Sequence, residues 1–153
     1  MIAEKEIIVR EANSKDAEGI AKVLMLEKLG DEPWGGNRIF VAENLQKRPG
    51  KKQFVVLVAE SNSSIVGFVD CAIFPSFWEG EKQGLMIDFF VQPACQNRGI
   101  GSKLLEAIIK HADAENIAEL HVSTERKNQK ARNLYNKFGF TEEHLLLERA
   151  KKV

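Results

Sequence analysis

The feature that most constrains the fold is a change of apolar spacing around two glycines late in the chain. Residues 85–91 read as a strand, whereas from Gly99 onward the apolar residues recur every three or four positions, as on one face of a helix. The helix-spaced residues are Ile100, Leu104, Leu105, Ile108, Ile109 and Ala112, with Glu106, Lys110 and Asp113 outside the stripe. A strand, a polar loop and a helix that opens at Gly99 and Gly101 predict an anion site, because free amides and the positive helix end converge there.

The residues of this turn leave two interpretations open. Glycines at a helix start let the backbone approach phosphate oxygens, and Arg98 adds a forked donor, but glycines there also serve tight packing. Two other phosphate motifs are excluded. The chain has no Gly-x-Gly-x-x-Gly, and Gly101-Ser102-Lys103 has the wrong order for a P-loop.

The remaining patterns predict one α+β domain over residues 1–153, built around a mixed sheet. Alternating or β-branched runs predict strands over residues 7–12, 53–60, 65–74, 85–91, 118–123 and 140–148. Helices are expected over residues 14–29, 38–46, 99–112 and 128–138. Ser14 is expected to start the first helix, Asn62-Ser63-Ser64 to join two strands as a hairpin, and Gly139 to end the last helix.

Composition excludes several classes of partner. The 22 basic and 22 acidic residues balance, so no summed positive field favours nucleic acid. The longest apolar run, residues 54–59, is far below the roughly 20 residues that cross a bilayer, and the first residues lack a signal-peptide pattern. Cys71 and Cys95 lack the paired spacing of a zinc site, which fits a reducing compartment. We therefore expect a cytoplasmic protein with no metal site.

Two segments carry a resemblance to a known family. The run Val91-Gln92-Pro93-Ala94-Cys95-Gln96-Asn97-Arg98-Gly99-Ile100-Gly101 resembles the coenzyme A signature of the GNAT acetyltransferase superfamily, in which Gln/Arg-x-x-Gly-x-Gly/Ala follows a strand that ends in Val-x-Pro. The run from Asn128 to Phe140 is similar to its second signature, Asn-x-x-Ala-x-x-x-Tyr followed by Gly-Phe. The order of elements also fits, so the resemblance covers nearly the whole chain, although the first half matches only in pattern.

The resemblance implies a fold, a cofactor and a set of binding residues. The fold would be a mixed, mostly antiparallel sheet flanked by helices and splayed between strands four and five. The cofactor would be acetyl-CoA, with Phe90 and Val91 along the pantetheine and a nearby backbone N–H polarising the acetyl carbonyl. The pyrophosphate would be held by Gln96, Asn97, Arg98, Gly99, Ile100, Gly101 and Ser102, and Asn128, Ala131 and Tyr135 would also contact the cofactor. A homodimer would be usual.

Tyr135 is the candidate acid for the thiolate that leaves when an amine attacks the thioester directly, in a ternary complex. A free phenol has a pKa of about 10 and a thiol about 8.5, so the proton should move as the C–S bond breaks or remain hydrogen-bonded. The alternative is that Tyr135, the only tyrosine, fills a contact between helix and sheet.

Asp88 is the first candidate for the base that frees the lone pair of the acceptor amine. Met86-Ile87-Asp88-Phe89-Phe90-Val91 resembles the family pattern of carboxylates on this strand, but relatives with a glutamate just before the aspartate would place it at Ile87. An ordinary carboxylate has a pKa near 4, so Asp88 would need desolvation or a water relay. The alternative is a structural carboxylate bonded to neighbouring backbone.

The acceptor is expected to enter past two loops, residues 31–37 and 75–83. These loops supply Trp34, Trp78 and Glu79, and aromatic rings beside acids suit a cationic amine. The same aromatics could equally close the edge of the core or a dimer contact. The acceptor would be a primary amine of a small molecule or of a protein, and the alternative function is a sensor module that binds acyl-CoA without transfer.

Overall fold

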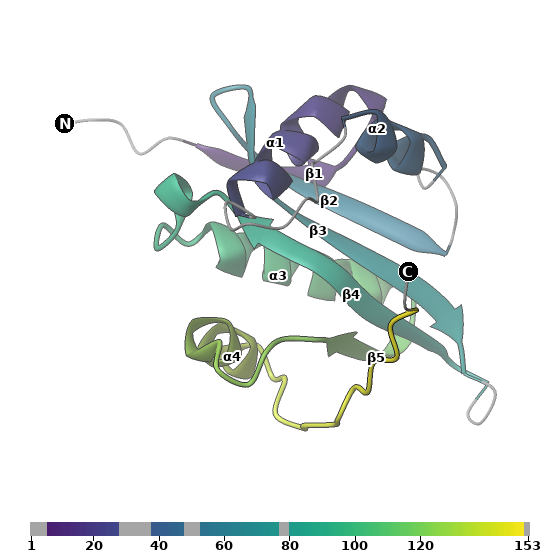
Figure 1. The fold of residues 1–153 in the computed structure, drawn as a ribbon. Helices are drawn as coiled ribbons and strands as arrows, with labels where there is room; N and C mark the ends of the chain where they lie inside the picture. Colours follow the sequence, from purple (N-terminus) through teal and green to yellow (C-terminus); the bar gives the residue numbers. More distant parts are fainter. Residues whose placement is uncertain (1–5, 28–37, 48–52, 77–79, 152–153) are drawn as a thin grey trace. The chain divides into compact units, whose positions relative to one another are not determined.

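Five strands in the order β1-β2-β3-β4-β5 form the sheet of the computed structural model (Figure 1). The structure describes residues 6–27, 38–47, 53–76 and 80–151. The chain divides into two compact units, residues 1–122 and 123–153, and each is described by itself. No helix in these described ranges is long and apolar enough to cross a membrane. The prediction of one domain over residues 1–153 stays a prediction.

The helices and strands alternate much as the residue patterns predict. In chain order they are β1 (Ile7–Glu11), η1 (Ser14–Asp16), α1 (Ala17–Glu27), α2 (Arg38–Lys47), β2 (Phe54–Ser61), β3 (Ser64–Pro75), β4 (Lys82–Val91), η2 (Pro93–Cys95), α3 (Ile100–Ala114), β5 (Ile117–Val122) and α4 (Gln129–Lys137). The first three strand pairings are antiparallel and β4 with β5 is parallel, which confirms a mixed, mostly antiparallel sheet.

The predicted hairpin joins β2 to β3 through a two-residue turn. Asn62 and Ser63 have φ angles of 50° and 59°. Two successive residues of positive φ make the turn type whose twist matches that of paired antiparallel strands. Asparagine tolerates this conformation better than most residues, so the local sequence explains where the chain reverses.

β4 changes its neighbours halfway along its length. Its ladder with β5 runs from Lys82 to Met86, where it ends opposite Val122, while its ladder with β3 continues to Val91. Within the described chain, the second half of β4 therefore pairs on one side only. This divergence confirms the predicted splay between strands four and five. A register shift at the same point leaves Ile87 as an extra residue, a β-bulge that increases local twist.

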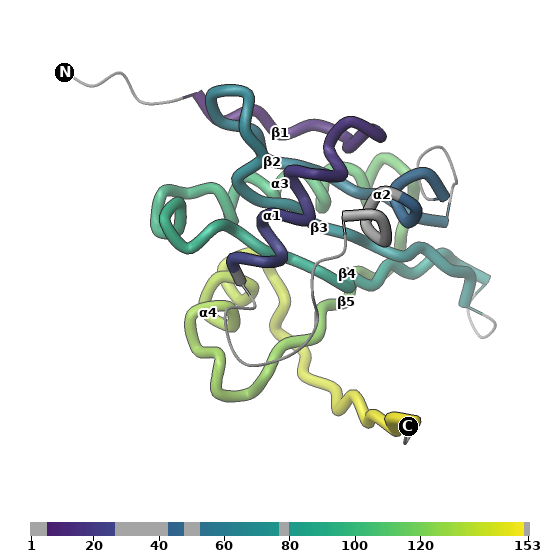
Figure 2. Tube along the Cα trace, turned by 45° about the horizontal axis from the view of Figure 1, so that its top comes forward, coloured from purple at the N-terminus to yellow at the C-terminus, as the bar shows by residue number. Residues whose placement is uncertain are grey.

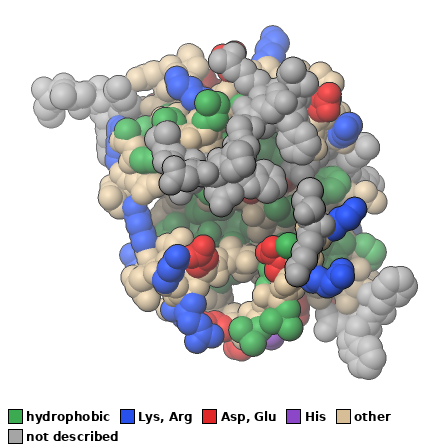
Figure 3. All heavy atoms as spheres, in the orientation of Figure 1, with side chains coloured by type: hydrophobic (Ala, Val, Ile, Leu, Met, Phe, Trp, Pro, Cys, Tyr) green, Lys and Arg blue, Asp and Glu red, His purple; other side chains and the backbone are tan. Residues whose placement is uncertain are grey.

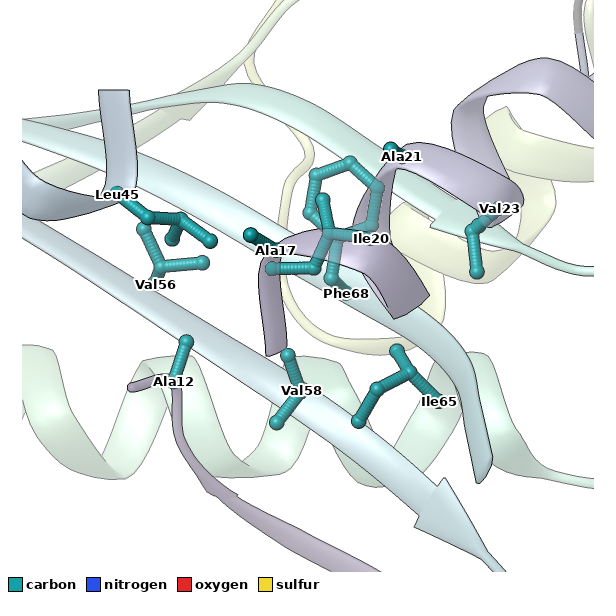
Figure 4. Close-up of a cluster of buried hydrophobic side chains, with 10 residues drawn as sticks. All are labelled: Ala12, Ala17, Ile20, Ala21, Val23, Leu45, Val56, Val58, Ile65 and Phe68. Atoms are coloured by element: carbon teal, nitrogen blue, oxygen red, sulfur yellow. The ribbon is translucent and has the colours of Figure 1, made fainter. Parts of the chain in front are cut away.

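α1 and α2 pack on one face of the sheet in the first unit, and α3 lies on the other (Figures 1 and 2). Figure 4 shows Ile20 of α1 beside the Phe68 ring, with Val58 below them and Leu45 of α2 beside Val56. The Phe68 ring lies 5.8 Å from the Phe90 ring of β4, centroid to centroid. This pair extends the apolar cluster onto the half of β4 that has lost β5.

α3 buries the predicted stripe against the opposite face. Ile100, Leu104, Leu105 and Ile108 are almost wholly buried, whereas the residues predicted to lie outside the stripe are exposed. A Cβ on Gly67 of β3 would lie 3.2 Å from a Leu104 methyl carbon and 2.8 Å from the Phe90 carbonyl oxygen. Glycine at this position therefore permits a close approach of helix to sheet.

The start of the first helix differs by one residue from the prediction. Asn13, not Ser14, is the capping residue: its side chain accepts from the Lys15 N–H at 2.9 Å, and the Asn13 N–H donates to Asp16 at 2.8 Å. Arg10 bonds both Asp16 and Glu60, which holds the pKa of Asp16 below its usual value. Asparagine and serine are near-equal caps, so a short motif with both cannot fix the boundary alone.

The prediction of a last strand over residues 140–148 is wrong. Residues 140–151 form no strand ladder, and the side chains of Leu145, Leu146 and Leu147 are 81%, 72% and 87% exposed. A strand exists only where a second strand completes its hydrogen bonds, and an apolar run does not reveal whether that partner is present.

On the face shown in Figure 3, basic and acidic side chains are interspersed, as the balanced composition predicts.

Candidate active site

A short loop between β4 and α3 is fixed by two glutamine side chains. Gln92 donates from its backbone N–H to the Val66 carbonyl at 2.8 Å and from its side chain to the Ile65 carbonyl at 3.0 Å. Gln96 donates from its side chain to the Val91 carbonyl at 3.1 Å. These bonds anchor both sides of η2 to the sheet, so the start of α3 has a defined position relative to β4.

The start of α3 has the properties of an anion site. Gly99 is left-handed with φ of 76°, and a Cβ added there would meet no described atom within 4 Å. Among the described residues, no side chain caps the first turn, and that turn carries no acid. Arg98 and Lys103 are exposed on either side of it. Uncapped amides, a positive helix end and two cations together favour a phosphate group.

The loop does not offer every amide that was predicted to bind phosphate. The Gln96 N–H already donates to the Pro93 carbonyl at 3.3 Å, and its side chain holds Val91. Asn97 is left-handed with φ of 60°, which turns the chain toward the helix. The amides suited to an anion are therefore those of residues 97–102, and Gln96 acts as the brace of the loop.

Along the part of β4 beyond the β5 ladder, every second residue points its backbone N–H and C=O groups away from β3. In an antiparallel pair, backbone groups point toward and away from the partner strand in turn. The bond from Gln92 to Val66 and the Phe90 carbonyl beside Gly67 both lie on the β3 side. The Val91 carbonyl instead accepts from Gln96. By this alternation, the edge that β5 has left carries the backbone groups of Phe89 and Val91, and the Phe90 backbone faces β3.

Asp88 lies on β4 two residues beyond the end of the β5 ladder and is half-buried. Ile87, where relatives with a second carboxylate would carry it, is the bulge residue and is 49% exposed. Directly opposite Asp88 on β3 stands Asp70, which is 2% exposed. The sequence analysis missed Asp70. Its signal was a single charged residue within the otherwise apolar run of residues 65–74.

In the second unit, α4 carries the other signature. Asn128 caps the helix, because its side chain accepts from the Ala131 N–H at 3.2 Å. Ala131 and Tyr135 stand four residues apart on α4, on one side of the helix. Arg132 forms an ion pair with Glu143. The spacing from asparagine to alanine is thus the spacing of a helix cap.

The end of α4 positions the tyrosine. The Phe140 N–H donates to the Tyr135 carbonyl at 3.2 Å and the Gly139 N–H to the Asn136 carbonyl at 3.1 Å, with Gly139 left-handed at φ of 91°. This is a complete Schellman motif. The Tyr135 and Phe140 rings, 5.8 Å apart, supply its apolar contact. The glycine and phenylalanine of the signature therefore fix the helix end beneath Tyr135.

Burial keeps the phenol of Tyr135 protonated. The residue is 7% exposed, and desolvation raises its pKa to about 12. The neutral hydroxyl is therefore present throughout the physiological range. Asn128, Ala131 and Tyr135 belong to the second unit, whereas the loop, the β4 edge and Asp88 are brought together in the first. Trp34, Trp78 and Glu79, predicted to bind the acceptor, lie outside the described residues.

Comparisons with known sequences agree on one family. The family model described as "Acetyltransferase (GNAT) family" matches residues 18–140. An uncharacterized N-acetyltransferase of Archaeoglobus fulgidus is 32% identical over 131 residues, 83% of this chain and 88% of that protein. An uncharacterized N-acetyltransferase of Bacillus subtilis, YhfO, is 33% identical over 101 residues, 65% of this chain and 66% of the relative. A spermine/spermidine N(1)-acetyltransferase of Bacillus subtilis is 35% identical over 79 residues, 50% of this chain and 52% of that one.

Solved structures share the fold at low identity. An aminoglycoside N-acetyltransferase, AAC(6')-Iy, in complex with CoA superposes with a TM-score of 0.79 at 15% identity. The match covers 100% of this chain and 99% of that one. At this identity the likeness concerns the fold, which places the chain in the same α+β class with a five-stranded mixed sheet.

Proposed function

The chain belongs to the acetyltransferase (GNAT) family and is an N-acetyltransferase, and we propose that it moves the acetyl group of acetyl-CoA to a primary amine of a small cationic molecule. The observation that carries the proposal is the open, uncapped start of α3. A Cβ at Gly99 would meet no described atom within 4 Å, so the backbone at this helix start is open to the approach of a ligand.

The cofactor is held by backbone along the path from β4 to α3. The amides of residues 97–102 bind the pyrophosphate, and Arg98 and Lys103 add positive charge. The backbone groups of Phe89 and Val91 on the β4 edge would hold the pantetheine, in the way that one strand pairs with another. Asn128 keeps its oxygen on the helix cap, which leaves its side-chain N–H donors for the cofactor.

The transfer needs a base for the amine, donors for the acetyl oxygen and a proton donor for the leaving sulfur. When bound, acetyl-CoA supplies a thioester whose carbonyl carbon is attacked directly by the amine nitrogen, with loss of the C–S bond. Asp88 accepts a proton from the acceptor ammonium, so that the nitrogen lone pair is free. The N–H groups of the β4 edge stabilise negative charge on the acetyl oxygen.

Tyr135 serves the leaving sulfur. Its pKa of about 12 exceeds that of a thiol, about 8.5, so complete proton transfer to a free thiolate would be uphill by about 5 kcal/mol. The hydroxyl therefore acts as a hydrogen-bond donor that gives its proton to sulfur as the C–S bond breaks. Being neutral, it adds no charge that would repel the thiolate.

The acceptor class rests on charge. Asp70 and Asp88 place two acidic residues on neighbouring strands where β4 has parted from β5, and acidic residues attract a cationic amine. One relative is named for spermine and spermidine, which are flexible polyamines. Trp34, Trp78 and Glu79 complete the acceptor site in this proposal.

The test measures release of free thiol from acetyl-CoA across a panel of amines. We expect release that depends on diamines or polyamines, with amino acids, aminoglycosides and a peptide N-terminus as comparison acceptors. Purified Tyr135→Phe is assayed in parallel and should bind acetyl-CoA but release thiol far more slowly. If the protein bound acetyl-CoA but released no thiol with any acceptor, the proposal would fail and the alternative function, an acyl-CoA sensor, would be favoured.

A further inference from the structure

Three side chains suited to an ammonium ion lie in one row across β3, β4 and β5. Phe74 is paired with Gln83 in the β3–β4 ladder, and Gln83 is paired with Glu119 in the β4–β5 ladder. Directly paired residues project from the same face of a sheet. Phe74 is 41% exposed, and the side chain of Glu119 is 51% exposed. An aromatic ring, an amide oxygen and a carboxylate are all groups that bind a primary ammonium.

The carboxylate of Glu119 is held in place by two neighbours. Gln83 donates from Nε2 to Glu119 Oε2 at 3.3 Å, and His121 Nε2 lies 3.3 Å from the same oxygen. Glu119 Oε1 and Gln83 Oε1 take no part in these contacts, and both can accept from an ammonium group. The neighbouring cation, Lys82, is directed toward the end of α3, where its Nζ donates to the Glu115 carbonyl at 3.0 Å. The row is therefore ordered and presents oxygen acceptors.

The same face of the sheet continues from this row to the place of the proposed base. The next row contains Ala72, Leu85 and His121, and the row after it contains Asp70 and Asp88, where β5 has parted from β4. Ala72 and Leu85 are half-buried, so they form an apolar floor between the two polar rows. Four residue steps along β3 separate the outer rows, about 13 Å at the rise of an extended strand.

We propose that Phe74, Gln83 and Glu119 form a subsite for the far ammonium group of a long α,ω-diamine or polyamine whose near amino group reacts beside Asp88. The subsite rests on the proposed function and narrows the acceptor class by the distance between two charges. Three bonds of an extended chain span about 3.6 Å, so the nine bonds between the nitrogens of diaminooctane span about 11 Å. Each ammonium then lies within about 3 Å of its row, with the methylene groups over the apolar floor. The five bonds of diaminobutane span only about 6 Å.

The first test compares acceptors of graded length. Release of free thiol from acetyl-CoA is measured with diaminobutane, diaminohexane, diaminooctane and diaminodecane. Octylamine is the matched acceptor, because it has the chain of diaminooctane and lacks the far charge. We expect kcat/KM to rise to a maximum near diaminooctane and to be about fivefold lower for octylamine. Equal kcat/KM for diaminooctane and octylamine would overturn the subsite and leave acetyl transfer in place.

The second test removes the far charge from the protein. Glu119→Gln keeps the size of the side chain, so kcat/KM for diaminooctane should fall about three- to fivefold, mainly through KM, while kcat/KM for octylamine stays unchanged. A merely structural role for Glu119 would lower both values alike, and that result would refute recognition. Glu106→Gln is the matched control, because it removes an exposed carboxylate from α3 on the opposite side of the sheet. It should change neither value.

A binding measurement separates the subsite from the chemistry. Diaminooctane is titrated by calorimetry into wild type and into Glu119→Gln, each in the presence of CoA, and the variant should bind about three- to fivefold more weakly. Binding that depends on Glu119, without thiol release for any amine, would refute the proposed function and keep the subsite. Acetyl transfer with a diaminooctane affinity that is independent of Glu119, or with no diaminooctane binding, would do the reverse.

Discussion

The start of α3 and the end of α4 carry the two signature segments, and they use opposite physical means. At the start of α3 the chain presents backbone, with an open position at Gly99 and exposed cations on either side. At the end of α4 a side chain is enclosed: Tyr135 is 7% exposed and its ring packs at a tilt against Phe140 within a helix-ending motif. The start of α3 offers exposed backbone because a side chain is absent at Gly99, whereas the end of α4 offers one side chain, Tyr135, that its neighbours bury.

This difference separates the kinds of substitution that each region tolerates. Adding atoms should damage the α3 start, because a Cβ added at Gly99 would enter the space proposed for the pyrophosphate and would meet no described protein atom within 4 Å. Removing one oxygen atom should damage α4, because the Tyr135 ring packs against Phe140 while the hydroxyl is the group proposed to donate a proton. Cofactor affinity and turnover are therefore expected to respond separately.

The largest effect is expected from Tyr135→Phe. Phenylalanine keeps the ring against Phe140 and removes the hydroxyl, so turnover should fall about a hundredfold or more with near-normal acetyl-CoA affinity. Steady-state kinetics and cofactor titration measure the two separately, and denaturant unfolding checks that stability is retained. An unchanged turnover would remove Tyr135 from the chemistry.

The next effect is a shift in the titration of the only tyrosine. Tyrosinate absorbance should appear with a midpoint near 12 in the folded protein, against about 10 in denaturant. Because the folded pKa is the higher one, this contribution to stability is complete below about pH 10 and is lost as pH rises toward 12. A folded midpoint at 10 would mean that the phenol is solvated.

A smaller effect is expected at Gly99. Gly99→Ala should weaken acetyl-CoA binding about tenfold, because its Cβ would project into the space of the pyrophosphate. Gly80→Ala is the matched control: Gly80 also has a positive φ, 66°, with no described atom within 4 Å of an added Cβ. Both variants carry the backbone strain, of order 1 kcal/mol, and only the first should lose affinity by calorimetry. Equal affinities would argue against the anion site.

The smallest effect concerns Asn128, which has two assigned tasks. Asn128→Ala should cost about 1 kcal/mol of unfolding free energy by loss of the cap, whereas Asn128→Ser should retain most of it. If the asparagine also touches the cofactor, both variants lose acetyl-CoA affinity. Denaturant titration and calorimetry on the same samples distinguish the tasks, and full affinity in both would leave only the cap.

Local signals explain what the sequence could predict. The α3 stripe, the helix start at Gly99 and the turn after β2 each depend on residues close in sequence, and the structure has all three. The last strand depended on a partner elsewhere in the chain, and residues 140–148 have none among the described strands. An apolar run alone did not carry that information.

In the candidate site, too, the parts that depend on neighbouring residues were predictable, and the parts that depend on strand pairing were not. The cofactor loop follows from a local motif, whereas the brace formed by Gln96 and the outward groups of Phe89 and Val91 depend on the β3 register. Asp70 and Asp88 are 18 positions apart in sequence, and only the ladder that joins β3 to β4 makes them neighbours. Pairings of this kind are fixed by folding and not by spacing.

The Schellman motif at Gly139 sets which side of α4 the chain leaves after Tyr135. An α-helix turns by about 100° per residue, so one residue inserted between Tyr135 and Gly139 would carry Phe140 around the helix and away from the Tyr135 ring. In this part of the enzyme, the number of residues between Tyr135 and Gly139 matters as much as their identity. An insertion there should therefore be more harmful than most substitutions.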